Sequence, residues 1–179
     1  MNSRSQDTID QVVHRSVSGL FEAYGAPVAP TAAPQTTSAD EECSEMAGVI
    51  GFCAEQLRGT VVVTTTEKVV LSTLPRGVST PESSDWLGEL SNQLLGRLKN
   101  QLGDFGIILQ VSTPVVLLGP KLRVFGSSLD GVRVYKFQLA ASASQPVTVM
   151  VELRAKDDLM LERVANQVAN AVEGTELFF

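Results

Sequence analysis

Apolar residues recur at intervals of three and four along two long stretches of the chain, and this spacing lines them up on one side of an α-helix. The first stretch covers residues 7–24 and is followed by Gly25, a residue type that commonly ends a helix. The second covers residues 81–102, with Pro81 suited to the first helical position and Gly103 after the last. The pattern predicts two long amphipathic helices, each with one buried face.

Four other runs are rich in β-branched residues or alternate apolar with polar positions, and they predict strands. They cover residues 48–57, 59–66, 132–140 and 147–154. A turn near Arg58 and Gly59 would join the first two runs into a hairpin, and the last two form a second hairpin. Two apolar pieces on either side of Pro114 predict two more strands, and residues 67–75 predict a short helix.

Two further segments complete the predicted organisation. Residues 26–45 are rich in proline, alanine and threonine, which is typical of an extended loop, and this loop would return the first helix to the sheet. Apolar residues again recur at helical spacing over residues 157–173, which predicts a C-terminal helix. We therefore expect a single α+β domain over residues 1–179, with a mainly antiparallel sheet and the central helix within residues 46–154.

The composition is that of a globular protein and narrows the class of function. The chain has 179 residues, of which 44% are hydrophobic and 19% charged, and its net charge is -6. An acidic chain without a basic cluster argues against nucleic acid and anionic membrane as partners. Because the N-terminus is polar and no apolar run is long enough to span a bilayer, we expect a cytoplasmic protein.

Few residues are available for a metal site, a disulfide framework or histidine-based catalysis. Cys43 and Cys53 are the only cysteines and His14 is the only histidine. The sequence therefore lacks the cysteine and histidine spacing of a zinc site, and a Ser-His-Asp arrangement would have to be built on His14 alone. Asp157 and Asp158 open the predicted C-terminal helix, where acidic residues commonly offset the helix dipole. We expect reduced thiols and no metal or cofactor held by this chain.

The central helix carries a polar face opposite its apolar stripe. The stripe consists of leucines, at positions Leu87, Leu90, Leu94, Leu95, Leu98 and Leu102. Glu89, Asn92 and Gly96 lie on the other side, spaced by three and four, so that they occupy successive turns. Glycine within a helix costs about 1 kcal/mol relative to alanine, so Gly96 indicates close approach by another surface. Polar residues at this spacing usually form only a solvated face, and the pattern by itself does not identify a site.

The segment G-E-L-S-N-Q-L-L-G-R-L-K resembles the helix signature of the CheC/CheX/FliY family of chemotaxis phosphatases. That signature is Glu-x-x-Asn followed by a small residue four positions later, and Glu89, Asn92 and Gly96 match it in order. With a single motif, the chain is more similar to CheX than to the two-site members. The predicted C-terminal helix lies outside the family pattern.

The resemblance implies a CheC/CheX-like α+β fold, a homodimer, and hydrolysis of the aspartyl phosphate on a CheY-type response regulator. In the family, the regulator itself holds the magnesium ion. By this resemblance, Asn92 would orient the attacking water and Glu89 would bind the regulator's active-site lysine. The role of Gly96, which would keep the helix face low enough for the regulator, follows from spacing alone.

Two other functions fit the same residues. The helix face can serve a non-catalytic binding or scaffold module, although docking alone does not require both Glu89 and Asn92. Alternatively, a homodimeric structural domain packs helix on helix at Gly96, with Glu89 and Asn92 incidental to its function.

Overall fold

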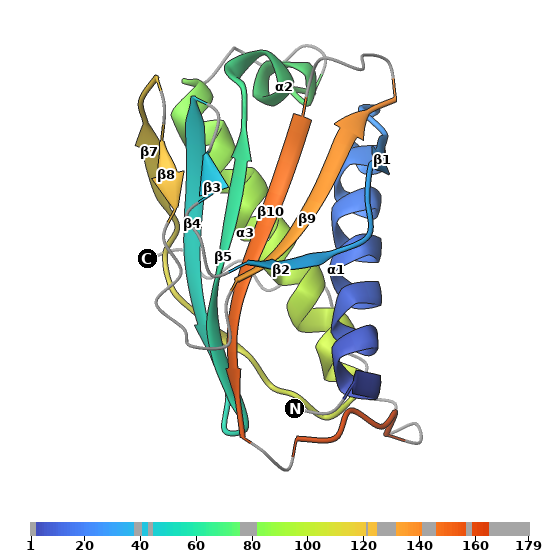
Figure 1. Ribbon diagram of the computed structural model, residues 1–179. Helices are drawn as coiled ribbons and strands as arrows, with labels where there is room; N and C mark the ends of the chain where they lie inside the picture. The colour runs from blue at the N-terminus through green and yellow to red at the C-terminus, as the bar shows by residue number, and fades with distance from the viewer. Residues whose placement is uncertain are drawn as a thin grey trace.

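An antiparallel sheet of eight strands forms the body of the molecule (Figure 1). A computed structural model describes residues 3–37, 41–42, 45–75, 82–120, 122–124, 132–140, 146–156 and 159–164. The strands are β1 (Val28–Pro30), β2 (Gln35–Thr37), β3 (Glu41–Glu42), β4 (Met46–Cys53), β5 (Leu57–Thr65), β6 (Gln110–Val111), β7 (Val115–Leu118), β8 (Arg123–Val124), β9 (Val132–Leu139) and β10 (Pro146–Ala155). The sheet order is β1-β9-β10-β5-β4-β6, with β2 also paired to β9 and β7 also paired to β4, while β3 and β8 form a separate pair.

Two long helices cover one face of the sheet, as their apolar stripes predict. The helices are α1 (Ser3–Ala23), α2 (Glu67–Ser72) and α3 (Ser83–Gly103). Figure 1 shows α3 running diagonally behind the strands with α1 beside it. Side chains alternate along β5, so Val61 and Val63 join the core under the helices whereas Val62 belongs to a smaller apolar cluster with Met150. The predicted α+β class is therefore confirmed.

Both predicted hairpins form, but the turn of the first lies earlier than expected. The chain turns at residues 54–56, where the Ala54 amide donates to the Leu57 carbonyl oxygen at 2.7 Å. Gly59, predicted at the turn, lies within β5, and a Cβ there would stand 2.1 Å from the Glu152 carbonyl oxygen. This glycine marks a close approach between strands and not a turn.

The ends of the two long helices differ in how well the sequence predicted them. Gly25 follows the end of α1 as predicted; it has φ 68°, and the Ala26 amide donates to the Phe21 carbonyl oxygen, which is a Schellman motif. Gly103 is instead the last residue of α3, and the left-handed conformation falls at Gly106, with φ 73°. Pro81, predicted as the first helical residue, lies outside the described residues.

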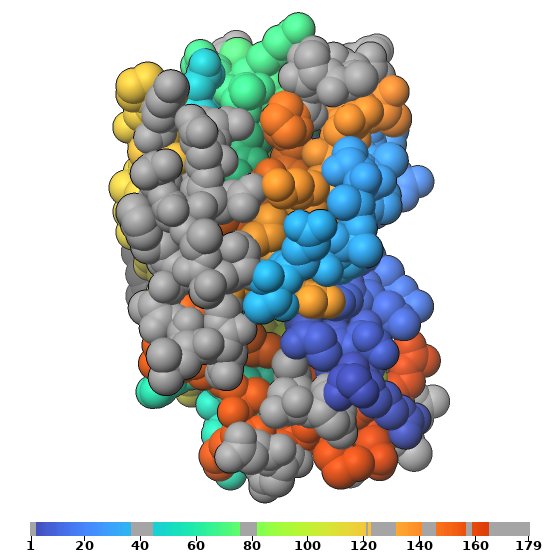
Figure 2. Space-filling view, viewed as in Figure 1, coloured from blue at the N-terminus to red at the C-terminus, as the bar shows by residue number. Residues whose placement is uncertain are grey.

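The prediction of a loop over residues 26–45 is wrong, because β1, β2 and β3 fall within it. Both β1 and β2 pair with β9, and Figure 2 shows residues 28–37 lying against β9 on the viewed surface. The proline-rich composition indicated extended backbone correctly. It did not distinguish a loop from short edge strands, in which proline is also tolerated.

The predicted C-terminal helix is wrong for residues 159–164, which have no regular secondary structure. Leu159 and Leu161 are buried, while Met160 between them is 62% exposed, so this segment follows an alternating and not a helical pattern. The Ser5 hydroxyl donates to the Leu159 carbonyl oxygen at 3.3 Å and accepts from the Leu161 amide at 3.2 Å. Residues 157–158 and 165–173 of the predicted helix lie outside the described residues.

Candidate functional site

The outer face of α3 presents the three residues that the sequence singled out. Glu89 and Asn92 are exposed and Gly96 is partly exposed, while the leucine stripe on the opposite side is buried. A Cβ at Gly96 would meet nothing within 4 Å, so the backbone there is bare on the outside. The structure therefore brings a carboxylate, a carboxamide and a flat stretch of helix together on one open surface.

Glu89 is held by a residue that the sequence pattern did not single out. The Gln93 side-chain amide donates from Nε2 to Glu89 Oε1 at 2.7 Å. The Tyr24 hydroxyl at the end of α1 donates in turn to Gln93 Oε1, also at 2.7 Å. The spacing of four residues between Glu89 and Gln93 is a signal that sequence can supply. Tyr24 is 69 residues from Gln93 along the chain, and no local pattern connects them.

The Tyr24 ring packs against Trp86, which is itself held in place by a hydrogen bond. Its ring meets the Trp86 ring edge-on, with centroids 5.3 Å apart and an interplanar angle of 82°. The Trp86 indole N–H donates to Thr73 Oγ1 at 2.8 Å, and Thr73 is fully buried after α2. The end of α1, the segment after α2 and the first turns of α3 are thus joined beside Glu89.

A close contact with β4 sets the distance between α3 and the sheet. A Cβ at Gly48 would lie 2.1 Å from Ser91 Oγ and 3.3 Å from Ser91 Cβ, so only glycine fits under the helix there. The Ser91 hydroxyl donates to the Leu87 carbonyl oxygen at 2.8 Å and so stays within its own helix. Gly48 is therefore a site of close packing between a strand and a helix.

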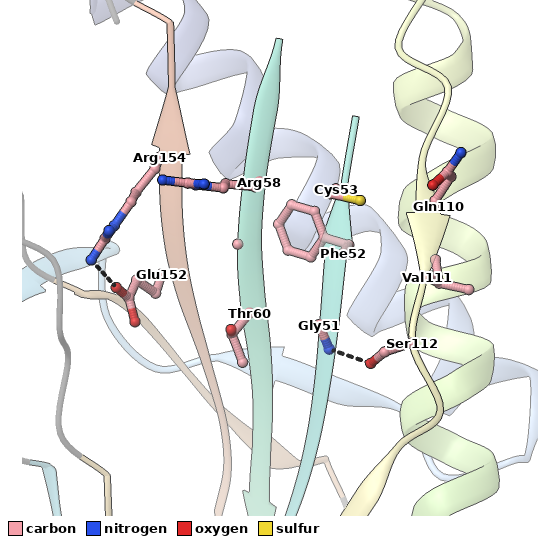
Figure 3. A pocket seen from close by; sticks show the side chains of 11 residues that line it. Gly51, Phe52, Cys53, Arg58, Thr60, Gln110, Val111, Ser112, Glu152 and Arg154 are labelled. Atoms are coloured by element: carbon pink, nitrogen blue, oxygen red, sulfur yellow. Dashed lines mark hydrogen bonds and ion pairs between the residues drawn. The ribbon is translucent and has the colours of Figure 1, made fainter. Parts of the chain in front are cut away.

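A pocket of about 560 Å³ lies away from these residues, at the end of the sheet near the β4–β5 turn (Figure 3). Arg58 and Arg154 lie opposite each other on β5 and β10, and Arg154 Nη2 is 3.6 Å from Glu152 Oε1. Glu89, Asn92 and Gly96 do not line this pocket. Their helix surface is open, so a ligand that engages it must be large enough to supply the enclosing side itself.

The remaining candidate residues take no part in this surface. Within the described ranges, no three His, Cys, Asp or Glu side chains gather as a metal site, and Asp157 and Asp158 lie outside those ranges. Cys53 is a free, exposed thiol, whereas Cys43 is not among the described residues. No described helix combines the length and apolar character that crossing a bilayer requires.

His14 is half-buried against β9 and is not part of the α3 surface. Its ring lies edge-on to Tyr135 and Phe137, with centroids 5.6 Å and 5.2 Å away. Burial lowers the pKa of His14 below its usual 6.5, and the nearby Asp10 carboxylate opposes that change. This environment disfavours the protonated imidazole and suits a packing role.

The architecture defines the chain as an α+β protein of the CheC/CheX fold. Neither a protein-family model nor a curated protein sequence matches it. A CheC-like superfamily protein from Shewanella sp. PV-4 superposes with TM-score 0.71 at 21% identity, over 87% of this chain and 100% of that one. The chemotaxis protein CheX from Desulfovibrio desulfuricans superposes with TM-score 0.70 at 19% identity, over 82% and 99%.

A third structure of this fold was solved as a complex. It is the CheX-CheY-BeF3-Mg+2 complex from Borrelia burgdorferi, similar with TM-score 0.58 at 13% identity, over 80% of this chain and 96% of that one. These likenesses confirm the resemblance that the Glu-x-x-Asn helix indicated and establish the fold of the chain.

Proposed function

We propose that this protein accelerates the hydrolysis of the aspartyl phosphate on a CheY-type response regulator in the cytoplasm. The observation that carries the proposal is the outward-facing pair Glu89 and Asn92, one turn apart on a helix of a CheX-like fold. The Borrelia burgdorferi CheX, which has the same fold, was crystallised with CheY. An open helix surface suits a protein substrate better than a small molecule.

Asn92 has the chemistry to position water. A carboxamide offers one acceptor and two donor positions and keeps its charge unchanged at all ordinary pH values. Beside the phosphoryl group it orients a water for in-line attack, a positioning task with no covalent role for this chain. The magnesium ion and the phosphorylated aspartate belong to the regulator in this mechanism.

Glu89 supplies the charge that fixes the register of the two proteins. Its carboxylate binds the active-site lysine of the regulator in a charge-assisted hydrogen bond. Gly96 lies one turn beyond Asn92 and has no side chain, so the regulator can approach the helix closely enough to contact Glu89 and Asn92. Of the three, Asn92 governs the chemical step and Glu89 governs binding.

We further propose that the protein is a homodimer joined at the β7 edge of the sheet. Strand β7 pairs with β4 on one side, and its Leu117 and Leu118 side chains are 46% and 62% exposed. Among the described strands only β4 pairs with β7, and an apolar strand at a sheet edge is a template for another strand. A second copy of β7 would cover both features.

The test is the rate of phosphate release from phosphorylated CheY-type regulators with magnesium present. Wild type is compared with Asn92→Ala, Glu89→Ala and the matched control Asn100→Ala, which alters another exposed residue of α3. We expect wild type and Asn100→Ala to accelerate release equally. We expect Asn92→Ala to lose about a hundredfold in kcat, in line with the loss of a positioning group.

Two results would overturn the proposal. Either no CheY-type regulator is dephosphorylated faster in the presence of wild type, or Asn92→Ala and Glu89→Ala work as well as wild type. Binding of a regulator without any change in its rate of dephosphorylation would favour the alternative function, a non-catalytic binding or scaffold module.

A further inference from the structure

We propose that Gln93 and Tyr24 are positioning residues that hold the Glu89 carboxylate ready for the regulator's cation. The inference rests on the proposed function and adds to it a fixed link between the exposed carboxylate and α1. The link is two hydrogen bonds of 2.7 Å each, from Tyr24 to Gln93 and from Gln93 to Glu89.

The direction of both hydrogen bonds is set by chemistry. An ionised carboxylate only accepts hydrogen bonds, so the NH2 end of the Gln93 amide must face Glu89. The amide oxygen then faces Tyr24, whose hydroxyl must donate. A flipped Gln93 amide would place its oxygen against the carboxylate, which is repulsive. The charge on Glu89 therefore selects one orientation for the whole chain of bonds.

Tyr24 is a rigid anchor for these two hydrogen bonds. It follows the last residue of α1, where the Gly25 turn fixes the backbone, and its ring packs edge-on against Trp86. Trp86 is held by its hydrogen bond to the buried Thr73. Because these groups are packed in place, the position of Gln93, and through it that of Glu89, is fixed relative to the core.

The fixed carboxylate keeps one oxygen available. Gln93 occupies Oε1, and among the described residues Oε2 has no hydrogen-bond partner. A free glutamate on a helix surface samples several rotamers, and immobilising it on binding costs affinity. Holding Glu89 in advance removes part of that cost, so loss of Gln93 or Tyr24 should weaken binding of the regulator and leave the chemical step unchanged.

The chain offers a matched control for this inference. Gln101 on α3 donates from Nε2 to Ser16 Oγ on α1 at 2.8 Å, a second side-chain bond between the same helices. It lies about three turns of helix beyond Glu89. Gln101→Leu removes its bond to Ser16, whereas Gln93→Leu removes the bond from Tyr24 and also the bond to Glu89.

The experiment compares Gln93→Leu, Gln93→Glu, Tyr24→Phe and Gln101→Leu for KM and kcat with the phosphorylated regulator. We expect KM to rise about fivefold for Gln93→Leu and Tyr24→Phe with kcat unchanged. Gln93→Glu sets two carboxylates side by side and should raise KM further. Gln101→Leu should leave KM at the wild-type value. In a Glu89→Ala background, Tyr24→Phe should have no additional effect on KM.

A second measurement needs no regulator. NMR three-bond couplings about the Cα–Cβ bond of Glu89 should report one rotamer in wild type and Gln101→Leu, and averaged rotamers in Gln93→Leu. Equal averaging in wild type and Gln93→Leu overturns the inference, as does an equal rise in KM for Gln93→Leu and Gln101→Leu. Failure of wild type to accelerate dephosphorylation overturns the proposed function, and with it the role of Gln93, even where the couplings show a single Glu89 rotamer.

Discussion

Arg133 on β9 holds the carboxylate of Asp10 on α1 with two nitrogens. Its Nε lies 3.1 Å from Oδ1, and its Nη2 bonds Oδ2. The Tyr135 hydroxyl and the Gln6 amide also donate to Oδ1, at 2.7 Å and 3.0 Å. A bidentate pair with two further donors fixes α1 to the edge of the sheet where β1 and β2 also pair.

Asp10→Asn should destabilise the protein at neutral pH by about 1.5–3 kcal/mol, the range for hydrogen bonds to a charged group. Asp7→Asn, at an exposed position of the same helix, is the control and should change stability little. Urea unfolding at pH 7 measures both. An Asp10→Asn variant as stable as Asp7→Asn would contradict the role given to this pair.

The contribution of Asp10 should also depend on pH. Burial alone would raise its pKa, but the hydrogen bonds from Arg133, Tyr135 and Gln6 outweigh burial and hold the pKa below 3.8. A carboxyl whose pKa is lowered by folding stabilises the fold above pH 3.8, and this stabilisation is lost as the pH falls through the folded-state pKa. The difference between wild type and Asp10→Asn in unfolding free energy should therefore shrink below about pH 4.

His14 predicts a second, separate pH dependence. Because burial lowers its pKa below 6.5, the unfolded chain binds a proton at pH values where the folded protein does not. Its stabilisation is complete above pH 6.5 and decreases as the pH falls toward the folded-state pKa. His14 is the only histidine, so denaturant midpoints of wild type should fall between about pH 7 and pH 5 more steeply than those of His14→Phe. Parallel curves for the two proteins would contradict this assignment.

The contact between Gly48 and Ser91 predicts a paired substitution effect. Gly48→Ala should destabilise the protein by about 1–3 kcal/mol, because its Cβ would overlap Ser91 Oγ and push α3 off the sheet. Ser91→Ala removes that oxygen, so the double variant should be more stable than the sum of the single effects predicts. Gly88→Ala is the control, since its Cβ would make an ordinary 3.5 Å contact with Val116. Strict additivity of the two substitutions would contradict the overlap.

Substitutions at Gly96 should affect the stability of the free protein and its activity differently. Gly96→Ala fills open space on a helix and should stabilise the protein by about 0.5–1 kcal/mol. Gly96→Leu also has room in the free protein, but its side chain would stand on the surface proposed to bind the regulator, so KM should rise about tenfold. Unfolding curves and dephosphorylation rates measure the two effects.

Light scattering of Gly96→Leu also tests the structural alternative, because a dimer packed helix on helix at Gly96 would dissociate.

A dimer at β7 predicts a different response to substitution. Leu117→Glu places a charge on the apolar edge and should convert the dimer to a monomer in light scattering. Leu71→Glu, at a leucine that is 40% exposed on α2, is the control and should leave the mass unchanged. Dissociation by both substitutions, or by neither, would argue against the β7 interface.

The sequence predicted what depends on local periodicity. The leucine stripe of α3 is long and regular, so its spacing alone predicts that Glu89 and Asn92 lie on the exposed face. It could not predict the link from Tyr24 to Gln93, because that link depends on how α1 and α3 pack. The predictions at Gly59 and Leu161 were wrong for a related reason. A glycine occurs both in turns and in close contacts between distant segments, and an apolar residue occurs both in helices and in such contacts.

The two edges of the sheet also limit how many copies can associate. β7 offers four consecutive aliphatic residues, whereas β1 and β2 are three residues each, and the segment that carries them includes Pro30 and Pro34, which have no amide hydrogen to donate. In the proposed dimer, a strand-to-strand contact at β7 uses the same edge on both partners, so that β1 and β2 at the opposite edge face outward. Association through the proposed β7 interface would therefore end at two chains, which would protect an apolar edge strand from open-ended fibre formation.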